Sequence, residues 1–316
     1  MSGRSRATRA AVTSFVLAQL MALSLSVHAA DEVKSADEGL REVPITERDR
    51  AWWAYRPLRT SAPPSVKRES WVATAIDRFV LAPLEAEGIE PNAIAGSTAL
   101  VRRLYLDVIG VPPSPDVVAH AASRLRDEQG DFSWDEWGKI VDRVLSDPRR
   151  GERWARHWLD VARFAESHGF EHDYDRNFAY HYRDFVIRAI NADMPYDQFS
   201  RWQLAGDEIA PGDPEAMRAT GFLGAGVFPT QITKREVERT RYDALDDMAS
   251  TTTLAMLGLN VGCARCHDHK FDPIPARDYY RFLSTFTTTV RSEVEVPVPV
   301  PALQKKVSQW KATQNA

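Results

Sequence analysis

The sequence predicts a mainly α protein, a multi-helix globular domain with an extended, aromatic N-terminal arm and a proline- and valine-rich C-terminal linker. Two observations lead to this prediction. Between residues 71 and 290, apolar residues recur at the three- and four-residue spacing of helices that bury one face. Few segments alternate between apolar and polar residues, as half-buried strands do. Helices without a sheet must pack on one another, which defines a helical domain.

The N-terminal part of the chain is predicted to be extended. Residues 30–70 are polar and then rich in proline, and they contain an aromatic segment at 52–57. The helices begin after this arm. A first helix is expected over 71–87, broken at Pro83, because proline lacks an amide proton and its ring clashes with the preceding turn.

Helix signals then follow one another along the chain. An apolar stripe over 100–108 is followed by Ser114 and Pro115, an N-cap residue and a favoured first-turn residue. The segment 150–166 is expected to bury its tryptophans on one face, with His157 beside that face. Further helices are predicted over 137–145, 182–190, 195–202, from Pro214, over 234–259 and over 278–286.

The end of the chain predicts a linker. Residues 294–301 alternate with proline, which favours extended or polyproline structure and excludes helix. Residues 303–316 then begin what could be a helix, as the truncated start of a further segment. The predicted organisation is a signal peptide over 1–29, the arm over 30–70, the helical domain over 71–290, and the linker with its truncated segment over 291–316.

The N-terminus has the composition of a secretory signal. Three arginines precede an apolar run over 10–27, and small residues up to Ala29 suit a signal-peptidase cut. Polar residues interrupt this run, which is barely long enough to span a bilayer. We therefore expect cleavage, no stable membrane span after it, and an exported protein in the periplasm or outside the cell.

Charge narrows the class of partner. The formal net charge of the chain is -4, and loss of the signal arginines makes the mature protein more acidic. Nucleic acid is therefore not expected as a partner. Apolar residues at 44% and nine tryptophans indicate a folded core.

The only two cysteines, Cys263 and Cys266, lie three positions apart, and His267 follows them directly. Covalent haem attachment needs this spacing, because two thiols one turn apart add to the two vinyl groups of a porphyrin. The adjacent imidazole then becomes the proximal ligand of the iron. We predict one covalent haem c on the two cysteines, which agrees with an export signal because such haem is attached outside the cytoplasm.

Three other interpretations of the cysteine pair stay open. A thioredoxin-like pair would begin a helix after a strand, whereas residues 254–262 resemble the end of a helix. Structural zinc would need a cramped set of the two thiols with His267 and His269. A disulfide would close a very small loop and add little stability.

The ligand on the other side of the iron is not determined by the motif. All six methionines precede it, which excludes the order of the common small cytochromes, where the methionine ligand follows. The late motif is similar, by analogy, to that of helical-bundle cytochromes. His157, between two tryptophans, and Met256, on the preceding helix, are the distal candidates, with core packing as the alternative for each. His269 is expected to hold the local turn or to act behind the ligand.

A second group of ligand-type side chains lies at residues 168–175. His168 and His172 are four positions apart among carboxylates, so they are candidates for a second metal site or for a base in a hydrolase. A solvated polar loop is the alternative.

Several segments together resemble the planctomycete-type secreted, cytochrome-associated family known as domain of unknown function 1549. The resemblance covers nearly everything from residue 50 to residue 290. It implies an exported protein, commonly larger, in which a related second domain follows and a cytochrome c-like domain sometimes precedes. It implies no established reaction. The matching segments are residues 53–57, 103–113, 154–160, 193–199, 203–207 and 263–274.

These observations support an exported c-type haem protein for electron transfer or redox chemistry, with haem at Cys263 and Cys266 and His267 as proximal ligand. The alternative is a haem-free secreted binding or accessory module, with a disulfide or another metal at the motif, that assists polymer capture or a partner enzyme. Whether the protein is an enzyme stays open. A redox partner protein is expected, together with a second domain or protein that replaces the missing C-terminal half.

Overall fold

A computed structural model describes residues 44–126, 130–170, 172–295 and 300–314. The predicted signal peptide and the first part of the arm lie outside these residues. Within them, the regular elements are helices, and the only β pairing is two isolated bridges, Arg126 with Phe132 and Ser167 with Asp175. The prediction of a mainly α fold is confirmed.

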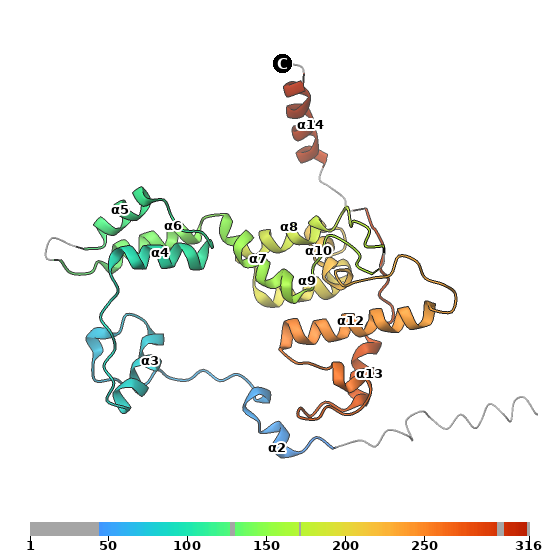
Figure 1. Cartoon of the computed structure of the whole chain (residues 1–316), viewed down its shortest axis with the longest axis horizontal. Coiled ribbons are helices and arrows are strands. Elements are labelled where there is room, and N and C mark those ends of the chain that lie inside the picture. The colour runs from blue at the N-terminus through green and yellow to red at the C-terminus, as the bar shows by residue number, and fades with distance from the viewer. Residues whose placement is uncertain (1–43, 127–129, 171, 296–299, 315–316) are drawn as a thin grey trace, which may run out of the picture. The chain divides into compact units, whose positions relative to one another are not determined.

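The helices follow one another in the order shown in Figure 1. Short 3₁₀ turns at Trp53–Tyr55, Glu69–Trp71 and Gly262–Arg265 separate some of them. The α-helices are α2 (Glu47–Arg50), α3 (Ala75–Ala86), α4 (Ser97–Val108), α5 (Pro115–Arg124), α6 (Trp134–Leu145), α7 (Arg149–Val161), α8 (Tyr180–Asn191), α9 (Tyr196–Ile209), α10 (Pro214–Ala219), α11 (Gly221–Gly224), α12 (Val237–Leu257), α13 (Ala276–Ser284) and α14 (Val300–Gln314).

The chain divides into two compact units. Of the described residues, the smaller unit contains 44–52 and Cys263–Arg281, and the larger unit contains the remainder. The segment with the two cysteines therefore groups with a short N-terminal helix, α2, that lies more than two hundred residues earlier in the chain.

The core of the larger unit lies among α7, α8, α9, α10 and α12. Helix α7 packs on α8 and on α12, and α10 packs on both α8 and α9; Figure 1 shows α7 to α10 side by side. The side chains of Phe185, Phe222 and Met248 are among the largest that are fully buried there. Burial of a side chain of this size is worth about 1.5–3 kcal/mol, so these helices hold the unit together.

A polar network crosses this core. The indole Nε1 of Trp158 donates to the Tyr182 hydroxyl at 3.0 Å and to Oε1 of Gln203 at 2.8 Å. The Tyr182 hydroxyl also donates to that oxygen, at 2.7 Å, and the Gln203 amide donates to the Phe199 carbonyl at 3.0 Å. Gln203 is fully buried. Because every polar group of its amide has a partner, the network specifies how α7, α8 and α9 meet.

Helix α3 differs from the prediction, because Pro83 lies inside it and does not break it. Thr74 and Asp77 cap its first turn, while the carboxylate of Glu85 accepts from the backbone amides of Lys67 and Arg68 at 2.8–3.0 Å. Pro83 lies close to the C-terminal end, where only a few residues follow it. Contacts on both sides of the proline therefore offset the one lost backbone hydrogen bond.

Helix α7 also differs from the prediction. It buries small residues against its neighbour and leaves Trp154 exposed. Trp154 is 49% exposed, whereas Gly151 and Ala155, one turn apart, are buried. The amide of Gly151 donates to Oδ1 of Asn191 at 2.9 Å, and a Cβ at this position would lie 2.5 Å from the Asn191 side chain. Small residues thus let α7 approach α8, and the expectation that Trp154 is buried is wrong.

Most other helix predictions are confirmed within a few residues. Ser114 caps α5 and Pro115 opens it, and α12 ends at Leu257, followed by the left-handed Gly258. At the C-terminal end, α14 begins at Val300, so helix includes the last two residues of the predicted linker, where proline is tolerated in the first turn.

Along the part of the chain that the structure describes, no helix combines the length and apolar composition that crossing a membrane requires.

Candidate functional site

The two cysteines lie on the surface at the end of a single 3₁₀ turn. The thiols of Cys263 and Cys266 are both exposed and are not joined in a disulfide, and the amide of Cys266 donates to the Cys263 carbonyl at 3.4 Å. His267 is exposed beside them. Its Nδ1 lies 2.8 Å from the carbonyl oxygen of Asp268. A carbonyl only accepts, so this contact assigns the proton to Nδ1 and leaves the lone pair of Nε2 available to a metal.

Helix α13 supports this turn from both sides. The carboxylate of Asp268 accepts from the amide of Ala276, the first residue of α13, at 2.8 Å. The hydroxyl of Tyr280, one turn further along, donates to the carbonyl of Arg265 at 2.8 Å. Sequence reasoning missed Tyr280, although its place within the predicted helix at 278–286 was the available signal. The residues on either side of Cys266 are thus attached to one rigid element.

His269 holds the loop that joins the motif to α13. Its amide donates to the Ile274 carbonyl at 2.9 Å, and its Nδ1 accepts from the amide of Asp272 at 2.9 Å. The side chain of His269 is only 10% exposed. The prediction that His269 holds the local turn is confirmed, and its ring faces this loop.

The surroundings of the thiols bear on the alternatives. Helix α12 precedes the cysteines, Cys263 lies within the 3₁₀ turn Gly262–Arg265, and no strand occurs in the described residues, so the thioredoxin-like arrangement has no support. The described part of the chain also contains no group of three or more His, Cys, Asp or Glu side chains that could hold a metal ion. Structural zinc needs four such ligands. Haem c needs only two thiols and one imidazole, which this turn presents together.

The two distal candidates lie in the larger unit. His157 is exposed on α7, with its ring centroid 5.6 Å from that of Trp154, and it lines a pocket between α7, α8 and the start of α9. Met256 is half-buried near the end of α12, and its carbonyl accepts from the Tyr196 hydroxyl at 3.3 Å. Met248, two turns earlier, is 2% exposed and fills the core. The distal role of His157 or Met256 stays a prediction.

Positively charged arginines lie near His168 and disfavour the binding of a cation there. Nε of Arg176 lies 3.4 Å from Nδ1 of His168. Burial, followed by the positive charges of Arg176 and Arg291, lowers the pKa of His168. His172 instead stacks on Tyr174, with ring centroids 5.4 Å apart. A second metal site on these two imidazoles stays a prediction, and Glu171 between them lies outside the described residues.

Two arginines, Arg163 and Arg176, hold the backbone around the His168 loop in place. Arg176 donates to the carbonyls of Ala225 and Gly226 at 2.5–2.6 Å. Arg163 donates to both oxygens of Asp247, at 2.6 and 2.7 Å. These arginines provide donors for backbone carbonyls at the end of α11 and link it to α7 and α12.

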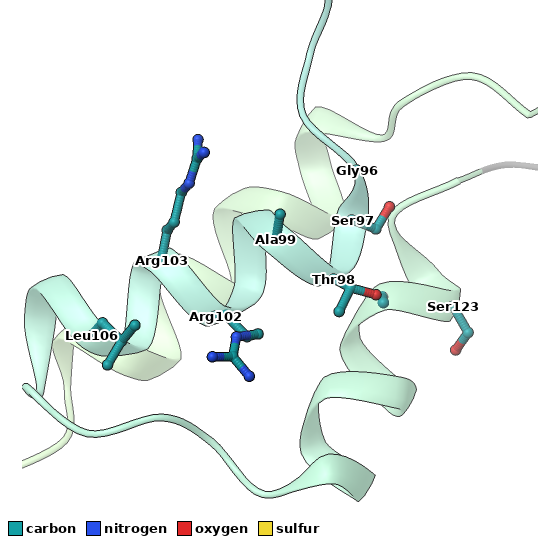
Figure 2. A pocket seen from close by; sticks show the side chains of 9 residues that line it. Gly96, Ser97, Thr98, Ala99, Arg102, Arg103, Leu106 and Ser123 are labelled. Carbon is teal, nitrogen blue, oxygen red and sulfur yellow. The ribbon is translucent and has the colours of Figure 1, made fainter.

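A broad hollow of about 770 Å³ lies against α4 and α5. Figure 2 shows that Arg102 and Arg103 extend from α4 in different directions, so they do not converge on one ligand. Both arginines are exposed, and the N-cap residue Gly96 makes no side-chain cap. This hollow is an open surface with diverging charges.

Comparison with known proteins agrees with the motifs. Residues 75–291 match the family described as protein of unknown function (DUF1549), named PSCyt2. The match includes α3 to α13 and the whole Cys263–His267 turn. No curated protein and no solved structure matches the chain. Because the match spans well over half of the sequence, the chain belongs to the DUF1549 family, the planctomycete-type cytochrome-associated family that its motifs resemble.

Proposed function

We propose that this protein is an exported c-type haem protein that transfers electrons, with one haem attached through Cys263 and Cys266 and with His267 as proximal ligand. The observation that carries the proposal is the single turn that presents two exposed thiols and an exposed imidazole. Thioether formation requires thiols that a porphyrin can approach from outside. The family name, with its reference to a cytochrome, supports the same cofactor.

The residues of the turn have distinct roles in this proposal. The two thiols would hold the porphyrin, and Nε2 of His267 would ligate the iron, because Nδ1 faces the Asp268 carbonyl. A hydrogen bond donated by Nδ1–H fixes the ring orientation and makes Nε2 a stronger ligand. Bound haem supplies one-electron redox chemistry. Asp268 and Tyr280 keep the turn on α13, so the three attachment points stay in place.

The exposed position of the turn favours exchange with a separate redox partner protein. Because Cys263 and Cys266 are exposed, a haem held by them would be accessible to a second protein. We also propose that the protein acts in the periplasm or outside the cell, since covalent haem is attached there.

Mass spectrometry and absorption spectroscopy test the cofactor. The full chain is produced in a host that matures c-type cytochromes and is then denatured. We expect its mass to exceed that of the mature polypeptide by one haem, and its pyridine-haemochrome spectrum to show thioether-linked haem. The double variant Cys263→Ser, Cys266→Ser should lose both signals. A wild-type chain with the mass of its amino acids alone would contradict the proposal and would favour the haem-free binding module.

His267→Ala separates attachment from ligation. This variant keeps both thiols, so a covalently bound haem with an altered iron coordination spectrum is expected. The matched control is His120→Ala on α5, an exposed histidine outside the motif. An unchanged spectrum in His267→Ala would remove His267 as proximal ligand.

A further inference from the structure

The larger unit contains a pocket that the haem proposal does not use. Its volume is about 580 Å³, within the range of about 300–1,000 Å³ typical of small-molecule sites. Four aromatic rings and a thioether form much of its wall: Trp154, Trp158, Tyr196, Phe199 and Met194. Rings and thioethers favour a flat aromatic ligand, because stacking and sulfur–ring contacts add to the apolar area that is buried.

The same wall carries a hydrogen-bond donor whose position is fixed. The Nη2 of Arg150 donates to the Ile190 carbonyl at 2.6 Å and to the Asn191 carbonyl at 3.4 Å, which anchors the guanidinium at the end of α8. Arg150 also lines the pocket. Its guanidinium therefore gives this wall a positive charge, which favours an acceptor oxygen on a ligand.

Asp193 provides the acceptor on the same wall, and its backbone has a left-handed conformation that usually favours glycine. Helix α8 ends in a Schellman motif, in which Met194 N donates to the Ala189 carbonyl at 2.9 Å and Asp193 N to that of Ile190 at 3.1 Å. Asp193 occupies the left-handed position of this motif, with φ +50°. Glycine is favoured at this position because a Cβ costs about 1 kcal/mol there.

At the ends of other helices in this chain, glycine occupies the same left-handed position. Gly88 follows α3 with φ +67°, and Gly258 follows α12 with φ +66°. The other charged residue in this position, Arg163 after α7 with φ +52°, uses its side chain for the ion pair with Asp247. The carboxylate of Asp193 is exposed, and the residue lines the pocket, so this side chain is accessible to a hydrogen-bond donor on a ligand.

We propose that this pocket binds a small aromatic ligand that carries a hydroxyl group. A phenolic hydroxyl both donates and accepts, so it matches the Asp193 carboxylate and a donor on Arg150 or His157 together. An anionic ligand would meet the Asp193 carboxylate, and a plain hydrocarbon would leave the polar groups unpaired. The aliphatic side chains Leu145 and Ile190 on the wall disfavour a sugar ring, which needs more polar partners. No residue of the Cys263–His267 motif lines this pocket, whereas His157, one of the two distal candidates, does.

Isothermal titration calorimetry on the full chain tests this site with a matched pair of ligands. The first probe is 2-naphthol, and the second is its methyl ether, 2-methoxynaphthalene, which has the same ring system but no proton to donate. We expect wild type to bind 2-naphthol about tenfold more tightly than the ether, since only the naphthol can donate a hydrogen bond to the Asp193 carboxylate. Cellobiose is the third probe and should not bind.

Substitutions then assign the binding to the pocket. Asp193→Gly should remove the preference for 2-naphthol while raising the midpoint of thermal unfolding, and Asp193→Asn should reduce the preference. Trp154→Ala should weaken both aromatic probes. Trp134→Ala is the matched control, because Trp134 is 53% exposed but lies on α6 away from the pocket.

Four results would overturn the proposal. They are no saturable binding of 2-naphthol, an equal affinity for the ether, a preference that survives Asp193→Gly, or the same loss in Trp134→Ala as in Trp154→Ala. Saturable binding of cellobiose would replace it with a carbohydrate site. Each measurement is independent of haem attachment, so it separates this site from the proposed cofactor.

Discussion

The hydroxyl of Tyr280 donates to the carbonyl oxygen of Arg265 at 2.8 Å, so the residue directly before Cys266 is attached to α13. Asp268 makes the corresponding attachment on the other side of Cys266, through the amide of Ala276. The turn that carries the thiols is short and exposed, and a short exposed turn has little cooperative stability of its own. Helix α13 is therefore what keeps its three attachment groups in one arrangement.

We expect Tyr280→Phe to lower the fraction of chains that carry covalent haem and to change the reduction potential of those that do. The substitution keeps the ring and removes only the hydrogen bond to Arg265, so the turn becomes less ordered. Mass spectrometry gives the attached fraction, and a redox titration gives the potential.

The matched control for Tyr280 is Tyr242→Phe on α12. Tyr242 is 49% exposed and Tyr280 is 45% exposed, so the two side chains are similarly accessible to solvent. The supporting role of Tyr280 would be excluded if both variants behaved like wild type in attached fraction and potential.

Asp247→Asn should lower the free energy of unfolding by about 2–4 kcal/mol, because it leaves the part-buried Arg163 without its charged partner. The side chains of this pair are 20% and 28% exposed. Chemical denaturation measures the loss. Asp243→Asn, one turn earlier on α12, changes a carboxylate that is 48% exposed and 3.6 Å from Arg239, and should cost less than about 0.5 kcal/mol. Equal effects of the two variants would show that the Arg163 pair does not hold α7 to α12.

Gly206→Ala should destabilise the fold by several kcal/mol or prevent folding, because the new Cβ would collide with the backbone carbonyl of Ala216. At Gly206, α9 lies against the backbone of α10, and backbone atoms of α10 cannot move aside as a flexible side chain can. Gly138→Ala on α6 is the opposite case, since nothing lies within 4 Å of its added Cβ. It should stabilise the protein by about 0.5–1 kcal/mol, as alanine does in an open helix interior. Thermal unfolding compares the two, and a tolerated alanine at 206 would refute the close approach.

The stability of the protein should fall as the pH drops below about 6.5. Burial, then the charges of Arg176 and Arg291, lowers the pKa of His168, and burial, then Arg218, lowers the pKa of His181. Between these lowered values and the ordinary pKa of about 6.5, the unfolded chain binds more protons than the folded chain, so acid favours unfolding. Well above the ordinary pKa of about 6.5, both imidazoles are neutral in both states, and this contribution is constant.

Thermal unfolding of wild type and of the double variant His168→Gln, His181→Gln, measured from pH 5 to pH 8, tests this dependence. The variant should lose part of the decline between pH 7 and pH 5. Parallel curves for the two proteins would show that other groups set the acid sensitivity.

The prediction of helices succeeded where local signals decide them. Ser114 and Pro115 mark the start of α5, and a long apolar stripe followed by Gly258 marks α12 and its end. It failed at Pro83, where distant contacts of Glu85 hold the helix together across the proline. It failed again at Trp154, because helical periodicity identifies large apolar residues but cannot tell that Gly151 and Ala155 form the closer contact with α8.

The sequence by itself determined the helical class, most helix boundaries and the Cys263–His267 turn, because periodicity, caps and the spacing of reactive groups are properties of neighbouring residues. Tertiary structure alone decided that this turn groups with residues 44–52, that Tyr280 supports it, and that Asp193 and Trp154 line one pocket. These relationships are between residues that are far apart in the chain, or they depend on the direction in which a side chain points. The physical reason is that packing between helices depends on which surfaces fit together, and no local pattern records that fit.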